Sequence, residues 1–168
     1  MSFCEEVLIL KKFLIVVLVI LVIAVAIVVI AGMNGGISTS KAFSFNVTTG
    51  DKIKVSLNTS DGYDIDYNIP FNISKDGENL SQGTFITMYG YNEYVNLAAS
   101  DSSIKVLDSG SRSDVEYTFY TVYNSNEKCN EYNYIIKVKD SNTGLLIGNI
   151  VSESSAKDIF DNLTFTKE

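Results

Sequence analysis

The chain has 168 residues, with 13 Lys and Arg, 20 Asp and Glu, and a formal net charge of −7. It contains no His, which excludes Ser-His-Asp triads, Cys-His pairs, His metal ligands and any imidazole base. The acidic balance argues against a nucleic-acid partner, because phosphate recognition normally uses a basic surface. The mean hydropathy is nonetheless positive, at +0.14, which indicates that apolar and polar residues are unevenly distributed along the chain.

The apolar residues gather in one run near the N-terminus. No charged or strongly polar residue occurs from Phe13 to Ala31, and Gly32 and Met33 follow. About 20 residues, at a rise of about 1.5 Å each, cover the roughly 30 Å hydrocarbon core of a bilayer. The run therefore predicts a single transmembrane helix over residues 13–33, acting as a signal anchor. A cleaved signal peptide is the alternative, because small residues end the run.

The charges that flank this run predict its orientation. Lys11 and Lys12 precede it, and Lys41 is the first cation after it. The positive-inside rule predicts that residues 1–12 are cytoplasmic and that the chain beyond the run lies outside the plasma membrane, with the reverse orientation as the alternative. Cys4 and Cys129 would then lie on opposite sides of the membrane and form no bridge with each other.

The rest of the chain is predicted to be a tether and one domain. Residues 34–41 are mostly Gly and small polar residues, which are typical of a flexible linker. Residues 42–168 have the length of one ordinary domain. Because the first 33 residues contain two Lys and two Glu, the remainder keeps 11 basic and 18 acidic residues and the whole net charge of −7.

Apolar and polar residues alternate in short segments that turn-forming Gly, Asn, Asp and Ser residues separate, which is typical of antiparallel strands. The predicted strands are residues 43–47, 53–57, 63–69, 71–73, 84–88, 103–107, 115–123, 131–139 and 145–150. Residues 92–100 fit either a short helix or a strand, and 108–114 are predicted to be a loop. Residues 152–163 predict a helix, in which Ser155 and Asp158 have the character of a capping box.

This order of elements predicts an α+β fold class. A single N-terminal transmembrane helix is followed by a mainly antiparallel β-sheet domain, and a C-terminal helix covers one face of the sheet.

The later part of the chain has a distinctive arrangement around its only proline. A short extended segment, Tyr67-Asn68-Ile69-Pro70-Phe71, precedes the two long strands, and a helix leads to a hydrophobic strand over residues 156–165. In this pattern residues 64–168 resemble the PsbP/Mog1-like family, although the Trp common after the opening proline and a lipobox are absent. The chain is also similar to small membrane-anchored surface proteins of methanogenic archaea. The resemblance implies a fold used for docking and assembly and supplies no catalytic residue.

Three closely spaced carboxylates, Asp61, Asp64 and Asp66, are candidate calcium ligands, because a hard cation prefers oxygen. In an EF-hand numbered from Asp64, the sixth and twelfth positions would be Gly and Glu, but they are Ile69 and Lys75. A looser calcium site is therefore one interpretation, and a solvated strand face is the other.

Tyr89, Tyr91 and Tyr94 form a candidate binding surface for a sugar or a peptide, since each tyrosine offers a flat apolar ring with a polar tip. The alternative is that these rings are half-buried against a sheet.

Five Asn-x-Ser/Thr triplets are candidate N-glycosylation sites, which would fit an exported domain. They begin at Asn46, Asn58, Asn72, Asn79 and Asn162. A chain this rich in Asn, Ser and Thr contains about two or three such triplets by chance.

The chain has no Gly-rich phosphate loop, no CxxC pair and no cofactor fingerprint, so we predict no cofactor and no catalytic residue. The sequence favours a membrane-anchored, extracytoplasmic, non-catalytic domain that binds or scaffolds at the cell surface. Its partners would be the lipid bilayer, through residues 13–33, and a protein or cell-wall component. The alternatives are a pilin-like structural subunit and a surface enzyme that uses carboxylates in place of His.

Overall fold

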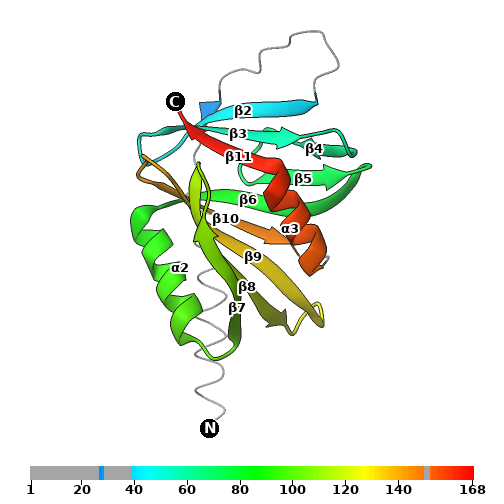
Figure 1. Ribbon diagram of the computed structural model, residues 1–168, viewed down its shortest axis with the longest axis vertical. Helices are drawn as coiled ribbons and strands as arrows, with labels where there is room; N and C mark the ends of the chain where they lie inside the picture. Colours follow the sequence, from blue (N-terminus) through cyan, green and yellow to red (C-terminus); the bar gives the residue numbers. More distant parts are fainter. Residues whose placement is uncertain (1–26, 29–38, 150–151) are drawn as a thin grey trace.

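The structure is a computed structural model that describes residues 27–28, 39–149 and 152–168 (Figure 1). The strands are β1 (Ile27–Val28), β2 (Ser40–Asn46), β3 (Lys52–Asn58), β4 (Tyr63–Ile65), β5 (Phe71–Lys75), β6 (Glu78–Thr87), β7 (Ile104–Ser111), β8 (Val115–Asn124), β9 (Cys129–Val138), β10 (Thr143–Asn149) and β11 (Leu163–Lys167). The helices are α2 (Met88–Ser100) and α3 (Glu153–Asn162).

The described strands form two antiparallel sheets. The smaller has the order β1-β2-β3-β11, and the larger has the order β4-β5-β6-β10-β9-β8-β7. The last strand of the chain thus joins the second hairpin strand, where Phe165 lies opposite Val55. The longest ladder of the larger sheet joins β8 and β9, where Phe119 lies opposite Tyr134.

Local sequence explains why β2 and β3 form a hairpin. Phe43, Phe45 and Val47 alternate with polar residues before a turn at Thr48–Asp51, in which Gly50 has a φ of +87°, a conformation that favours glycine. The amide of Val47 donates to the carbonyl of Asp51 at 3.0 Å, which closes the turn. The register that follows places Phe45 opposite Ile53, and both are fully buried.

The hydrophobic core lies between the two sheets and α3. The smaller sheet contributes Phe45, Ile53, Val55, Leu57, Leu163 and Phe165 to this core. The larger sheet contributes Phe71, Ile73, Val115, Phe119, Tyr134, Ile136, Val138, Leu145 and Ile147, and α3 contributes Ala156, Ile159 and Phe160. Because the side chains of all three layers meet in one cluster, neither sheet has a separate core.

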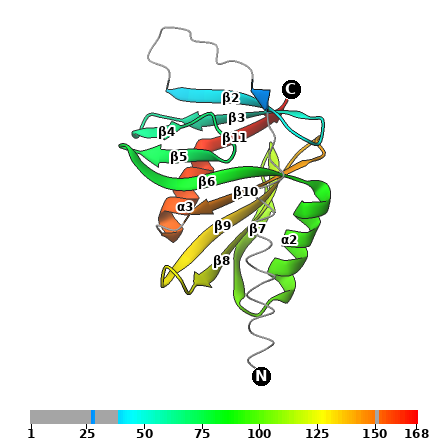
Figure 2. The same cartoon turned by 180° about the vertical axis from the view of Figure 1, so that it is seen from behind.

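The two helices cover opposite faces of the larger sheet. α3 stacks Phe160 on the core-facing Tyr134, at 4.2 Å between ring centroids, and lies in front of this sheet in Figure 1 and behind it in Figure 2. α2 contacts β6, β7, β9 and β10 from the other face, where a Cβ built on Gly144 would lie 3.1 Å from the Cβ of Tyr91. Each helix begins at a side-chain cap: Thr87 accepts from the amide of Gly90, and Ser152 accepts from that of Ser155.

The predicted fold class, α+β with an N-terminal transmembrane helix and one covering helix, is wrong. The described residues are mainly antiparallel β-sheet, and a second helix, α2, occupies the segment that fitted either helix or strand. Of the predicted transmembrane helix at residues 13–33, only Ile27–Val28 are described, and they form β1, which pairs with Phe45 and Asn46. Neither helix in the described part is both long enough and apolar enough to span a bilayer. The remainder of 13–33, residues 1–12 and most of the predicted tether lie outside the described residues.

Candidate functional site

The structure gives the candidate calcium ligands separate partners. Asp64 accepts a bond from Lys41 Nζ at 2.6 Å, and Asp61 is exposed in a turn. Asp66 accepts from the backbone and side-chain amides of Asn72, both at 2.7 Å. Desolvation raises the pKa of Asp66, but these bonds and those from Asn68 outweigh it and hold the pKa below its ordinary value. Among the described residues, no group of three or more His, Cys, Asp or Glu side chains is arranged to hold a metal ion.

The three tyrosines of the candidate binding surface lie on α2 but do not share a face. Tyr91 and Tyr94 are three residues apart, so they point toward the same side of the helix, and both are partly buried. Tyr89 precedes Tyr91 by two residues, about 200° around the helix. Its side chain is 76% exposed. Burial raises the pKa of both Tyr91 and Tyr94, as expected for rings that pack on the sheet.

The five candidate glycosylation residues differ in accessibility. Asn46, Asn58 and Asn79 are exposed at strand ends or near a turn. The amide of Asn72 donates to Asp66 while its oxygen accepts from Gln82 at 2.9 Å. The amide of Asn162 donates to the carbonyl of Asp158 at 2.8 Å. Glycosylation stays a prediction for all five, and the first three are the most accessible.

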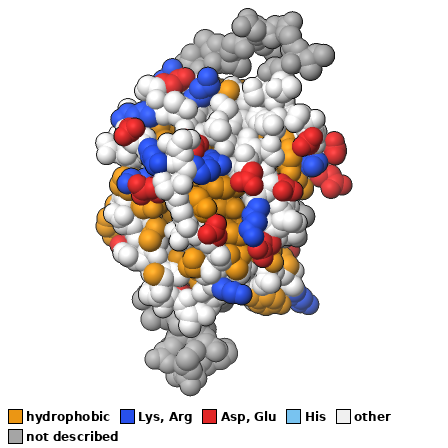
Figure 3. Space-filling view, in the orientation of Figure 1, with side chains coloured by type: hydrophobic (Ala, Val, Ile, Leu, Met, Phe, Trp, Pro, Cys, Tyr) orange, Lys and Arg blue, Asp and Glu red, His pale blue; other side chains and the backbone are white. Residues whose placement is uncertain are grey.

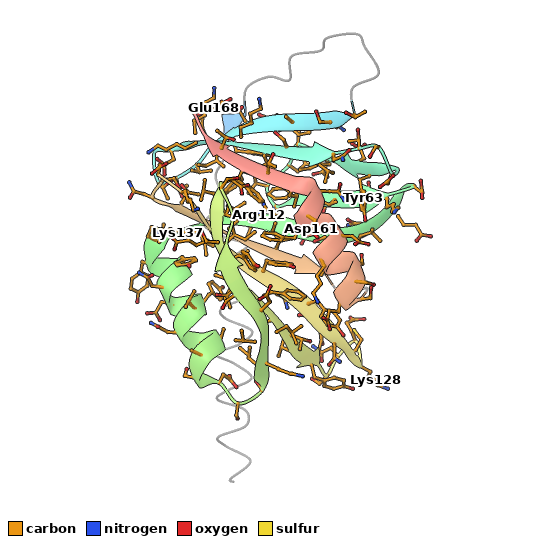
Figure 4. The ribbon with its side chains drawn as sticks, in the orientation of Figure 1. Tyr63, Arg112, Lys128, Lys137, Asp161 and Glu168 are labelled. Carbon is orange, nitrogen blue, oxygen red and sulfur yellow. The ribbon has the colours of Figure 1, made fainter. Side chains whose placement is uncertain are left out.

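A different constellation lies where the end of β7 meets the end of α3. Asp108 comes from β7, Tyr117 from β8, Tyr134 from β9 and Asp161 from α3. We call these four residues the Tyr117–Tyr134 site. Figure 4 shows Asp161 beside Arg112, and Figure 3, in the same orientation, shows hydrophobic side chains exposed just below that place, with acidic and basic side chains around them.

A column of aromatic rings forms the floor of this site. Phe119 stacks on Tyr134 with 4.4 Å between centroids, and Tyr134 stacks on Phe160 with 4.2 Å. Tyr117 contacts the column from the side, 4.9 Å from Phe160 and 6.0 Å from Tyr134. The column extends to Tyr132, whose centroid is 6.4 Å from that of Phe119. Such stacked rings form a rigid apolar platform, because neighbouring rings restrict one another's rotation.

The polar groups of the site have unequal numbers of partners. The Tyr117 hydroxyl donates to Asp108 Oδ2 at 3.0 Å. Tyr134 is only 4% exposed, and no other residue in the described part of the chain makes a hydrogen bond with its hydroxyl. Asp108 and Asp161 are exposed, and neither forms an ion pair with another described residue. The site therefore combines one nearly buried, unpartnered hydroxyl with two carboxylates that have no counter-ion.

Two fully buried hydroxyls in the described part of the chain lack a hydrogen-bond partner, and both are enclosed by protein. They belong to Tyr67 and Thr84. The ring of Tyr67 lies within an aromatic cluster, 4.8 Å from the centroid of Phe43 and 5.4 Å from that of Phe45. The Tyr134 hydroxyl, in contrast, keeps a small contact with solvent beside the two carboxylates. Unlike those two hydroxyls, it is open to solvent and to a ligand.

Both neighbouring cations already have partners. Arg112 donates to the carbonyls of Phe160 at 2.8 Å and Leu163 at 2.9 Å, and pairs with Asp114 at 3.2 Å. Lys157 pairs with Glu153 at 2.6 Å. Asp108 and Asp161 thus have no ion-pair partner of their own, although the charge of Asp108 also acts on Lys157, which lies 5.6 Å from the centroid of Phe119.

The tyrosines of the site stay protonated over the physiological range. Burial raises the pKa of Tyr134, and the charge of Asp161 raises it further. Burial also raises the pKa of Tyr117, with a further contribution from its bond to Asp108. Both phenols are therefore neutral hydroxyls that donate or accept hydrogen bonds, and neither is an ionised nucleophile.

The sequence did not predict this site. The alternation in β8 and β9 placed Tyr117 and Tyr134 on the inner side of two strands. Asp108 was predicted to lie in a loop, and Asp161 comes from a separate helix. The only signal in the sequence was the excess of tyrosine on the inner side, because a buried Tyr needs a partner for its hydroxyl whereas Phe does not.

Comparison with known protein families, characterised proteins and solved structures gave no match for the chain. The resemblance to PsbP/Mog1-like proteins therefore stays a prediction.

Proposed function

We propose that this chain is a non-catalytic binding protein and that the Tyr117–Tyr134 site is its contact surface. The nearly buried Tyr134 hydroxyl, which has no hydrogen-bond partner among the described residues, carries this proposal. The hydroxyl keeps only a small contact with solvent and no described side chain bonds to it, so a ligand that made a hydrogen bond with it would take the place of water.

The surroundings of the hydroxyl favour binding over catalysis. Tyr117 offers a partly exposed ring beside the buried aromatic column, and the two exposed carboxylates near it supply orientation, a combination typical of recognition sites. The tyrosines are protonated at neutral pH, so each hydroxyl can donate as well as accept a hydrogen bond.

We further propose that this domain works at the outer side of the plasma membrane, attached to lipid by the apolar run of residues 13–33 outside Ile27–Val28, which pair with β2. The support is the sequence: the run from Phe13 to Ala31 has no charged residue, and transfer of apolar side chains out of water favours association with a bilayer.

Site-directed photocrosslinking in the cells that make the protein tests the proposed function. A photoreactive phenylalanine analogue replaces the exposed Ser109, beside Asp108, in the full chain. The same analogue at the exposed Glu93, on α2, is the matched control. We expect a light-dependent adduct of discrete mass from position 109, in the membrane fraction, and none from position 93. Adducts of equal yield from both positions, or none from position 109, would contradict a binding role for the site.

A further inference from the structure

The chemistry of the Tyr117–Tyr134 site restricts what it accepts. Asp108 and Asp161 present carboxylate oxygens, which only accept hydrogen bonds, and neither forms an ion pair with a described cation. The ligand group must therefore donate hydrogen bonds and is favoured if it carries positive charge. An anionic ligand would meet two like charges, and a purely apolar one would leave the Tyr134 hydroxyl without a partner.

One further feature favours a cation at this place. The partly buried ring of Tyr117 adds an aromatic surface, and organic cations bind favourably to such rings. The fold already uses this contact nearby, where the guanidinium of Arg112 lies 4.1 Å from the centroid of Phe160.

The cation is better matched by an organic ammonium than by a metal ion. The described part of the chain holds no group of three or more acidic, Cys or His side chains arranged for a metal. An ammonium group, in contrast, needs few acceptors, and its carbon chain can lie against the partly exposed ring of Tyr117.

We propose that the Tyr117–Tyr134 site binds an organic ammonium group, such as the side chain of a lysine, between Asp108 and Asp161, with the Tyr134 hydroxyl as an additional hydrogen-bond partner. This inference rests on the proposed function and specifies its ligand. Two sources share this chemistry, a lysine on a protein surface and a free polyamine, and the experiment separates them.

The test is calorimetric titration of the purified full chain with three probes: a tetralysine peptide, the same peptide with every side chain acetylated, and spermidine. We expect saturable binding of a charged probe and none of the acetylated peptide. Stronger binding of tetralysine supports a protein as the source, and stronger binding of spermidine supports a free polyamine. Equal binding of the acetylated and charged peptides would overturn the proposal, as would the absence of binding by both charged probes.

Three variants locate the interaction. Asp161→Asn removes one charge, and we expect about a tenfold loss of affinity. Tyr134→Phe removes only the hydroxyl, and we expect a loss of roughly threefold to tenfold. Glu93→Gln, an exposed residue of α2, removes the same charge elsewhere and should leave the affinity unchanged. Thermal unfolding of each variant shows that the fold is intact.

An equal effect of Asp161→Asn and Glu93→Gln would mean that the peptide senses only the overall charge, and this would also overturn the proposal. If the photocrosslink at position 109 forms but neither charged probe binds, the site binds a different ligand class and only the assignment of an ammonium ligand fails. If both experiments are negative, the proposed function fails as well.

Discussion

At the scale of single residues, the most deeply buried carboxylate of the described structure is Asp51. It is 8% exposed, pairs with Lys167 at 3.0 Å, and accepts bonds from Thr143 Oγ1 at 2.9 Å and the Asn142 amide at 2.7 Å. Desolvation raises the pKa of Asp51, but these hydrogen bonds outweigh it, so the pKa lies below its ordinary value. The ionised carboxylate therefore stabilises the folded state.

We predict that Asp51→Asn lowers the free energy of unfolding by about 1–3 kcal/mol at pH 7. A carboxyl whose folded-state pKa is depressed stabilises the fold above its unfolded pKa of about 3.9 and loses that contribution as the pH falls through the folded-state value. The difference between wild type and variant should therefore shrink below about pH 4.

Urea denaturation at pH 7 and pH 3 measures this difference. The exposed Asp61→Asn is the control and should change stability by less than about 0.5 kcal/mol. A deficit of the same size at both pH values would show that the charge of Asp51 is not the cause.

At the scale of secondary structure, Arg112 joins three elements. It follows β7, donates to the carbonyls at the end of α3, at Phe160, and the start of β11, at Leu163, and pairs with Asp114. Asp114 in turn accepts a hydrogen bond from the backbone amide of Phe165 at 3.0 Å. This amide lies on the edge of β11 that faces away from β3. These contacts connect the end of the larger sheet to the edge of the smaller one and hold α3 above the aromatic column.

We predict that Arg112→Lys destabilises the protein by about 1–3 kcal/mol although the charge is kept, because an ammonium cannot reproduce the planar fork of donors. The loss should appear as faster amide hydrogen exchange in α3 and β11 than in β5, which four strands of the larger sheet separate from β7. Lys105→Gln, in the exposed part of β7, is the control and should leave exchange unchanged. Equal acceleration in β5 would argue against a local clamp.

At the scale of the whole molecule, the two sheets are one folding unit. Phe165 in the smaller sheet is 1% exposed, and Phe119 and Tyr134 in the larger sheet are 0% and 4% exposed in the same cluster. The apolar faces of the two sheets are buried against each other and against α3. Unfolding of one sheet would therefore expose the apolar face of the other sheet to water. Cooperative unfolding follows from this shared core.

A core truncation in the smaller sheet tests this expectation. Phe165→Ala should lower the free energy of unfolding by about 3–5 kcal/mol, because it removes a large buried ring and leaves a cavity. Amide exchange through global unfolding should then accelerate in β9 of the larger sheet by the same factor as in β3, roughly a hundredfold or more. Val106→Ala, at an exposed valine, should change neither strand. Acceleration confined to β3 would show that the sheets unfold separately.

The β-rich character of the domain was predictable from the sequence, because alternation has a period of two wherever one face of a strand is buried. Tyr117 and Phe119, and Tyr134 and Ile136, point into the core as that alternation indicates. The predicted strand over residues 103–107 ends before β7 does, because Asp108–Ser111 lacks the apolar residues that would have indicated a longer strand. An edge strand needs only backbone bonds to its neighbour, and those residues pair with β8.

The sequence left α2 ambiguous between helix and strand because its Tyr and Asn residues have low helix propensity. Packing of the segment on the sheet decides that it is a helix.

The sequence by itself determined where the apolar run and the charges lie, that His-based chemistry is absent, and that strands dominate the domain. These properties depend on composition and on spacing between near neighbours. Only the tertiary structure decided that β11 pairs with β3, and that Asp108, Tyr117, Tyr134 and Asp161 converge. That convergence depends on strand register and on where α3 packs. Both arise from burial of apolar surface shared by residues far apart in the chain, a non-directional effect that no short sequence window contains.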